Sequence, residues 1–141
     1  MFYRSVSAAE FLQAFLKARL TSDKVAQATS QVAEVADGLA EEDRCFLVSG
    51  GMGGFIVKAD GELLAVFSLV KGRGAALIQA AIMQGATHLD CFDGYLVELY
   101  KQHGFVETDR IEWDEKYAPV RWDYGRFGAP DVVCMVHQTE L

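Results

Sequence analysis

Residues 63–76 of this chain read LLAVFSLVKGRGAA. The run Leu63–Phe67 is apolar and typical of a strand, and the glycine-rich turn Lys71–Ala76 follows it where a helical pattern begins. The first amides of a helix have no partner within the helix, so such a turn directs free N–H groups at one point in space. This arrangement commonly holds a phosphate. The stretch therefore predicts a strand, a turn and a helix (75–84), with an anion site where the helix begins.

The residues that follow continue the alternation of strand and helix. Residues 88–105 read HLDCFDGYLVELYKQHGF, in which an apolar run precedes the turn Asp93-Gly94. A helix is predicted over 95–102, because Gly104 ends its pattern. A strand is predicted over 105–113, where apolar and polar residues alternate. With the first stretch, this part of the chain predicts a β-α-β-α-β unit.

The N-terminal third predicts one strand and two helices. Residues 2–6 are a short strand candidate, and Ser7 with Glu10 three residues later forms a capping box at the start of a helix. The sequence 21–23 breaks that helix and caps a second amphipathic helix, which ends near Gly38. Two consecutive helices are therefore expected before the central strands.

Strands are also predicted over 45–48, 54–58, 62–69 and 130–137. The second and third of these flank Asp60-Gly61, a strong hairpin signal. The predicted order is β-α-α-β-β-β-α-β-α-β-β. It indicates an α/β fold in a single domain, residues 1–141, with a mixed, mostly antiparallel twisted sheet and helices on both faces.

Composition is that of a globular protein, with 51% hydrophobic and 23% charged residues. No apolar run reaches the length that crosses a bilayer, and the first residues lack the pattern of a secretory signal. The three cysteines, Cys45, Cys91 and Cys134, are widely spaced, so we expect buried free thiols in a cytoplasmic protein and no metal site.

The formal net charge is −7 at pH 7. Such a surface repels the phosphates of nucleic acids, and we expect no nucleic-acid partner. An acidic field attracts cationic molecules, such as amines, or basic proteins.

The order of elements and two motifs resemble the GNAT N-acetyltransferase superfamily. The family pattern at the turn is Gln/Arg-x-x-Gly-x-Gly/Ala, and Lys71–Ala76 matches it with Lys in the first place. The later family run, an apolar residue and Tyr followed by Gly-Phe, matches Leu99–Phe105. The Asn that often opens the family's later helix is replaced by Asp93-Gly94-Tyr95. The wider run Leu89–Tyr95 resembles a divergent branch found in phage and prophage proteins.

This resemblance implies a GNAT-like fold and acetyl-CoA as the acyl donor. The pyrophosphate would lie on the backbone amides of the turn, and the pantetheine arm would lie along the preceding strand. The residues that match these positions are Phe67, Ser68, Leu69, Lys71, Gly72, Arg73, Gly74, Ala75 and Ala76. The alternative is a strand-to-helix turn that holds no ligand.

The resemblance also implies a catalytic residue, Tyr100, which matches a tyrosine that protonates the departing thiolate in many GNAT enzymes. Tyr100 could instead pack its ring beneath the sheet, and Tyr95 is a reserve candidate on the same helix. Three carboxylates, Glu62, Asp90 and Asp93, are weighed as a general base, and none is preferred. The three histidines are expected to be structural.

Residues 113–128 are rich in aromatic and charged side chains. They lie where the family often shapes its acceptor pocket, so the rings could hold a cationic amine. Equally, they could cover the sheet or form a homodimer contact.

Two functions follow. The first is an acetyl-CoA-dependent N-acetyltransferase in which an amine, on a small molecule or a protein, attacks the thioester directly. The alternative is a non-catalytic GNAT-fold binding or host-modulating protein of phage origin.

Overall fold

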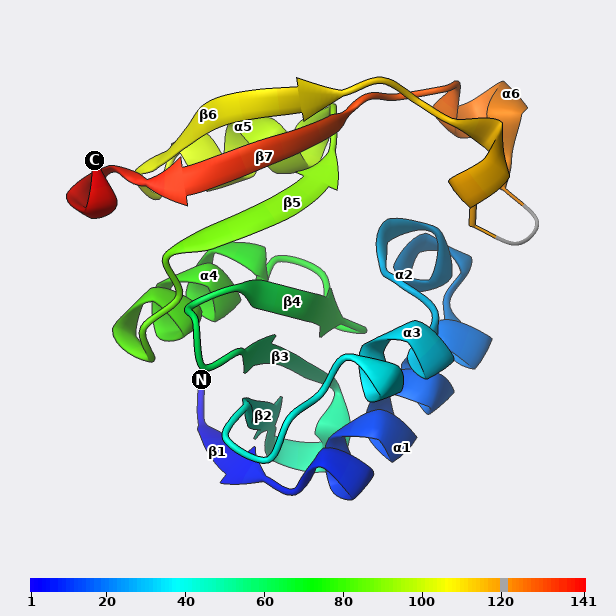
Figure 1. Ribbon diagram of the computed structural model, residues 1–141. Helices are drawn as coiled ribbons and strands as arrows, with labels where there is room; N and C mark the ends of the chain where they lie inside the picture. Colours follow the sequence, from blue (N-terminus) through cyan, green and yellow to red (C-terminus); the bar gives the residue numbers. More distant parts are fainter. Residues whose placement is uncertain (120–121) are drawn as a thin grey trace. The chain divides into compact units, whose positions relative to one another are not determined.

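The computed structural model describes residues 1–119 and 122–141, so Val120 and Arg121 lie outside the described residues. The described residues form two compact units, Met1–Thr87 and His88–Leu141. Figure 1 shows the elements of both, and each unit is described by itself.

The first unit contains a four-stranded antiparallel sheet in the order β1-β2-β3-β4. Its strands are β1 (Tyr3–Val6), β2 (Arg44–Val48), β3 (Gly53–Val57) and β4 (Leu63–Ser68). A short 3-10 helix, η1 (Ser49–Gly51), joins β2 to β3. The Asp60-Gly61 turn joins β3 to β4 as predicted, and Asp60 Oδ1 accepts a hydrogen bond from the Glu62 amide at 2.9 Å.

Three helices pack on one face of this sheet (Figure 1): α1 (Ala8–Thr21), α2 (Asp23–Ala28) and α3 (Val32–Asp37). Phe11 and Phe15 of α1 are fully buried, and their rings lie 5.8 and 5.5 Å from the ring of Phe67 on β4. Burying a phenylalanine side chain stabilises a fold by about 2–3 kcal/mol. These rings therefore fix α1 over β4.

The opposite face of the sheet carries a second aromatic group. Because side chains alternate along a strand, Phe46 points away from its neighbours Cys45 and Leu47, which pack toward α1. Phe46 stacks on Phe55 at 5.0 Å. The helix α4 (Gly74–Met83) packs against β3 and β4 and buries Leu77, Ile78, Ala80 and Ala81. The sheet thus has helices on both faces, as predicted.

The predicted second helix is wrong in one respect: it is two helices. The break falls at Thr29–Gln31, where the Thr29 hydroxyl donates to the Val25 carbonyl and Thr29 takes an extended conformation. Arg19 of α1 donates to the carbonyl groups of Ala26 and Ser30. A side chain from another helix therefore satisfies acceptors that a continuous helix would have used itself.

The predicted capping of α1 is confirmed, because the Ser7 hydroxyl accepts from the Glu10 amide at 3.1 Å. The Glu10 carboxylate does not complete the capping box with its own helix. It pairs with Arg4 on β1 instead.

Strand β4 contains a β-bulge. The pairing of β3 with β4 shifts between Gly54 and Ile56, so that two residues of β4 oppose Phe55. Ala65 lies in this bulge with φ of 52°, a left-handed conformation that is uncommon for any residue but glycine. Gly54 beside it admits no side chain, because a Cβ atom there would lie 2.4 Å from the Phe46 carbonyl oxygen.

The second unit contains a three-stranded antiparallel sheet in the order β5-β7-β6. The strands are β5 (His88–Phe92), β6 (Phe105–Ile111) and β7 (Val132–His137). The helix α5 (Tyr95–Lys101) follows β5 and buries Val97 and Tyr100. Between β6 and β7 the chain forms η2 (Glu115–Tyr117) and α6 (Tyr124–Phe127), and η3 (Gln138–Glu140) follows β7.

The predicted order of elements is confirmed, with α3 and α6 as additions. The strands divide into two sheets, where the sequence predicted one. No helix among the described residues has the length and apolar character to cross a membrane. All three cysteines are free, but only Cys45 is buried, and Cys91 and Cys134 are half-buried.

Candidate functional site

The chain leaves the sheet abruptly at the end of β4. The Leu69 amide donates to the Met52 carbonyl at 2.8 Å and extends the pairing by one residue. The Ser68 hydroxyl then donates to the Val70 carbonyl at 2.7 Å and accepts from the Val70 amide at 3.0 Å. One side chain therefore occupies both main-chain groups of Val70, and the turn toward α4 begins there.

The start of α4 is open. Arg73 is its N-cap residue and has no side-chain capping bond, and the Leu77 amide makes the bond to the Arg73 carbonyl at 3.0 Å. Within the part of the chain that the structure describes, Lys71 and Gly72 form a turn that links Val70 to Arg73, and the amides of Gly72 and of residues 74–76 donate to no acceptor. Gly72 has φ of 86°, and nothing lies within 4 Å of the position that a Cβ atom would take. The turn is thus a cradle of unpaired N–H groups.

The charge around this cradle is positive. Residues 68–76 include two cations, the exposed Lys71 and the half-buried Arg73, and no carboxylate. Neither cation forms an ion pair with another described residue. The positive end of the helix dipole adds to their field. The cradle therefore suits a phosphate or diphosphate.

The candidate pantetheine-binding residues at the end of β4, Phe67, Ser68 and Leu69, differ in which of their groups a ligand could reach. The Phe67 side chain is buried in the core, so only its main chain is available to a ligand. Ser68 uses its hydroxyl within the turn. Since β4 is an edge strand of its sheet, its main-chain groups on the side away from β3 form an open row. An extended amide-bearing chain can pair with such a row.

Tyr100 is buried on α5 in the second unit, and its ring lies edge-on to Phe105 at 5.6 Å. Its hydroxyl makes no hydrogen bond with any described residue. Burial raises the pKa of Tyr100 well above its usual value, and the nearby Cys91 adds to the effect. The phenol therefore keeps its proton at neutral pH. The reserve candidate Tyr95 is 72% exposed on the same helix.

Cys91 is not a reactive thiol. Burial, with the negative field of Asp90 and Asp93, raises its pKa to about 12. The thiolate is the reactive form of cysteine, and this thiol stays protonated.

Asp93 is bound up in an ionic cluster. Arg110 donates to Asp93 Oδ2 at 2.7 Å, to Glu107 Oε1 at 2.7 Å and lies 3.3 Å from Asp131 Oδ2. The hydrogen bond from Arg110 lowers the pKa of Asp93. Sequence reasoning missed Arg110, because two of its three partners, Asp93 and Asp131, lie outside its strand β6. The cluster holds Asp93 ionised, which makes this residue a poor proton acceptor.

The contacts of the other two carboxylate candidates, Asp90 and Glu62, do not indicate a general base. Asp90 accepts a hydrogen bond from the Cys134 thiol on the neighbouring strand β7. The Glu62 main chain belongs to the β3–β4 turn, where its carbonyl accepts from the Lys58 amide at 2.9 Å. No group of three or more metal-binding side chains comes together among the described residues.

The contacts of His137 and His103 are those of structural residues. His137 Nε2 lies 3.1 Å from the His103 carbonyl oxygen, and its Nδ1 lies 2.8 Å from the Thr139 hydroxyl. Because a carbonyl only accepts, Nε2 carries the proton and donates it. The ring thus ties the end of β7 to the end of α5.

The aromatic segment packs on itself. The rings of Trp113 and Trp122 lie 5.1 Å apart, and Phe92 lies 5.8 and 5.0 Å from them. Phe127 lies 5.2 Å from Trp122, and the Trp122 indole donates to the Gly128 carbonyl at 2.8 Å. This packing favours the interpretation that the segment covers the sheet over that of an open aromatic box for a cation.

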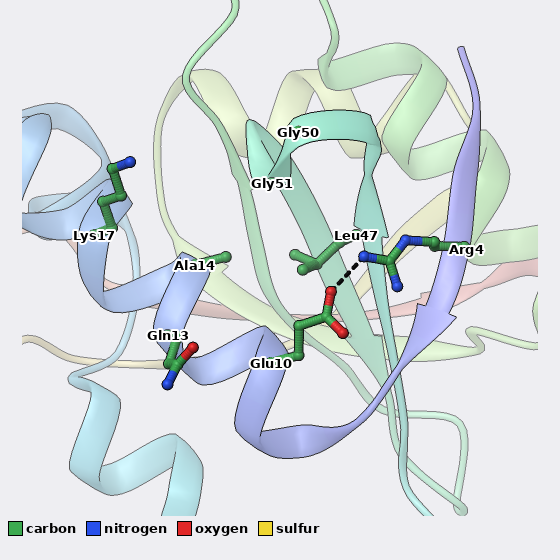
Figure 2. A pocket seen from close by; sticks show the side chains of 8 residues that line it. All are labelled: Arg4, Glu10, Gln13, Ala14, Lys17, Leu47, Gly50 and Gly51. Carbon is green, nitrogen blue, oxygen red and sulfur yellow. Dashed lines mark hydrogen bonds and ion pairs between the residues drawn. The ribbon is translucent and has the colours of Figure 1, made fainter.

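A pocket of about 320 Å³ lies elsewhere in the first unit (Figure 2). Its lining residues are Arg4, Glu10, Gln13, Ala14, Lys17, Leu47, Gly50 and Gly51. Figure 2 shows the Arg4–Glu10 ion pair at one side of it and Leu47 between the charged groups. It is lined by none of the residues of the cradle. Sequence reasoning did not find this pocket, because four elements contribute to it: β1, α1, β2 and η1.

Comparisons with known proteins bear on the fold. No protein-family model matches the chain, and no curated protein matches its sequence. Solved structures do match. The ribosomal-protein-S18-alanine N-acetyltransferase from Escherichia coli superposes with a TM-score of 0.58 at 17% identity, over 95% of this chain and 90% of that one. The chain has the GNAT fold.

Two further GNAT-fold structures cover the chain as fully. The GNAT-family acetyltransferase from Streptococcus pneumoniae has a TM-score of 0.59 and 17% identity, over 95% of this chain and 96% of that one. The IAA acetyltransferase from Bacillus cereus has a TM-score of 0.62 and 12% identity, over 96% and 97%. The predicted fold class is therefore confirmed.

Proposed function

We propose that this GNAT-fold protein is an acetyl-CoA-dependent N-acetyltransferase. One observation carries the proposal: the amides of Gly72 and of residues 74–76 are unpaired at the positive end of α4, beside Lys71 and Arg73. Nothing in this turn competes with a diphosphate, because it contains no carboxylate and Gly72 leaves open space. The residues present therefore fit the pyrophosphate of CoA.

In this proposal the chain holds the cofactor in two places. The diphosphate is bound by Lys71, Gly72, Arg73, Gly74, Ala75 and Ala76. The pantetheine arm lies along the end of β4 at Phe67, Ser68 and Leu69 and pairs there with the main-chain groups that point away from β3. When bound, acetyl-CoA supplies an activated thioester. By holding the thioester in a fixed position, the protein lowers the entropic cost of bringing the acceptor amine and the thioester together.

Tyr100 is the proton donor in this proposal. The phenol carries its proton at neutral pH and would deliver it to the departing sulfur. The acceptor is an amine, on a small molecule or a protein. The net charge of −7 attracts such a cation, which must lose one proton before it attacks. With Asp93 paired and Asp90 accepting the Cys134 thiol, we propose that water takes that proton.

Calorimetric titration with CoA tests the cradle. The variant Ala75→Glu places a carboxylate at an exposed position in the first turn of α4, where a negative charge stabilises the helix. We expect the fold to persist and the affinity for CoA to fall at least tenfold, because the diphosphate meets a like charge. Gln79→Glu is the matched control, since it adds the same charge one turn further along α4 and should leave the affinity nearly unchanged.

The absence of measurable binding to the wild-type protein at high micromolar CoA contradicts the proposal. Equal affinity of Ala75→Glu and the wild type shows that CoA binds elsewhere.

The alternative is a non-catalytic binding or host-modulating protein of phage origin on the same fold. Among the described residues, the engagement of Asp90 and Asp93 by other groups favours it, because neither is free to act as a base. For either function we propose that the protein is located in the cytoplasm. Phage origin is part of the alternative. An assay of acetyl-CoA consumption against a panel of amines separates the two functions. CoA binding without turnover of any amine would support the alternative.

A further inference from the structure

We infer that Ser68 is a positioning residue for the cradle. Its hydroxyl fixes the point at which the chain leaves β4 and thereby sets the direction of the amides of residues 72–76. This inference rests on the proposed function, because it gives Ser68 a role in cofactor affinity beyond the contacts of its main chain.

The first step of the argument is the way in which Ser68 holds Val70. The Ser68 oxygen accepts from the Val70 amide at 3.0 Å and donates to the Val70 carbonyl at 2.7 Å. Neither group of Val70 can then extend the β3–β4 pairing, whose last bond runs from the Leu69 amide to the Met52 carbonyl. Without the hydroxyl, Val70 would be free to take other conformations.

The second step is that little else in the described residues holds this part of the turn. Apart from the turn that links Val70 to Arg73, residues 70–72 make no hydrogen bond other than the two to Ser68. Gly72 in the same stretch has φ of 86° and no neighbour at its Cβ position. Its main chain is therefore free to take other φ and ψ values. Fixing a residue's main chain costs about 1–2 kcal/mol. A ligand that had to order the turn itself would bind more weakly.

The third step is that a purely structural serine would act differently. Loss of a hydrogen bond that only supports the fold lowers stability and leaves the affinity of the folded protein unchanged. Thr29 provides the comparison, because its hydroxyl donates to the Val25 carbonyl at 2.6 Å in the same unit, at the end of α2. Ser68 and Thr29 thus each donate a hydrogen bond from a hydroxyl to a main-chain carbonyl. Only Ser68 lies next to the cradle.

The test compares Ser68→Ala, Ser68→Thr and Thr29→Val with the wild type. Titration with CoA measures affinity, steady-state kinetics with acetyl-CoA measure KM and kcat, and hydrogen exchange reports the Val70 amide. For Ser68→Ala we expect about tenfold weaker CoA binding, a matching rise in KM with kcat little changed, and faster exchange at Val70. Ser68→Thr keeps the hydroxyl and should restore affinity. Thr29→Val should bind CoA as the wild type does.

The outcomes separate this inference from the proposed function. If the wild type does not bind CoA, the proposed function fails and this inference with it. If the wild type binds and Ser68→Ala binds equally well, only this inference is overturned. An equal loss of affinity in Thr29→Val would also overturn it, because the effect would then follow stability and not the turn.

Discussion

Tyr100 combines a buried ring with a hydroxyl that has no partner among the described residues. The sequence left a catalytic and a packing role open for Tyr100, and the structure shows the packing. The ring packs edge-on against Phe105, while burial raises the pKa and keeps the phenol protonated. A proton donor must carry its proton at the working pH, and this environment ensures that.

Removing this hydroxyl tests its role. Tyr100→Phe should lower kcat about 100-fold, the lower end of what general acid catalysis contributes, with CoA affinity unchanged. Because the pKa is raised, the wild-type rate should show no loss of this acid between pH 7 and 10. Steady-state kinetics across that range provide the measurement. Unchanged turnover in Tyr100→Phe would remove the residue from catalysis.

Ala65 is the other residue whose local conformation carries information. Its φ of 52° costs a non-glycine residue about 1–2 kcal/mol, and strain of this kind persists only where the surroundings impose it. The bulge lies on the strand proposed to bind the pantetheine arm.

Two substitutions at this position should differ in the size of their effect. Ala65→Gly should change the free energy of unfolding by less than about 1 kcal/mol, because relief of strain offsets added chain entropy. Ala65→Val should lower it by about 2 kcal/mol or more, since a β-branched side chain tolerates this conformation poorly. Urea denaturation measures both. Equal stability of the two variants would show that the bulge shifts to another residue.

At the scale of elements, the strands and helices were predictable from local patterns, and their irregularities were not. Glycine and capping signals placed the ends of α1, α4 and α5 within a residue or two. The break between α2 and α3 depends on Arg19, which lies on another helix, and the bulge in β4 depends on its pairing with β3. Long-range partners of this kind leave no periodic trace in a sequence.

Asp43 joins two such elements, the loop before β2 and the turn after β3. Its carboxylate accepts from the amides of Ala40 at 2.7 Å and Ala59 at 2.8 Å. Partial burial acts to raise its pKa, but these two hydrogen bonds and the charge of Lys58 outweigh it, so the pKa is lowered. Folding therefore favours the ionised form.

This linkage has a definite sign. A carboxyl whose pKa is lowered by folding stabilises the protein above its unfolded pKa of about 3.9, and the contribution is lost as the pH falls through the folded value. Asp43→Asn should lower the free energy of unfolding at pH 7 by about 1–2 kcal/mol, and the difference should shrink as the pH falls below the unfolded pKa and through the folded one. Asp37→Asn is the control. A difference that stays constant from pH 7 to 3 contradicts the linkage.

At the scale of the whole molecule, the family resemblance predicted the fold, and the comparisons confirm it at 12–17% identity. The glycine-rich turn between β4 and α4 could be predicted because its residues are contiguous. The Arg110 cluster, by contrast, joins Arg110 to residues that lie 17 and 21 positions away in the sequence, and the pocket near Arg4 draws on four elements. Contiguous sites are visible in a sequence, and assembled sites are not.

Oligomeric state is the open question at this scale. The rings of the aromatic segment contact one another, which leaves them less available to a second copy. We expect light scattering to report a monomer for both the wild type and Trp122→Ala. The variant should unfold more readily by about 2 kcal/mol, because a half-buried tryptophan is lost from the cluster. A wild-type dimer that Trp122→Ala dissociates would establish the homodimer instead.

The Arg110 cluster has a consequence for how the second unit comes apart. Three acidic side chains, from the end of β5, from β6 and from the start of β7, share one guanidinium at the surface. If the arginine is removed or its field is screened by salt, the three repel one another at the point where the strands meet. Fraying should therefore start at this end of the sheet, and a protease would find its first cleavage sites in the neighbouring connections.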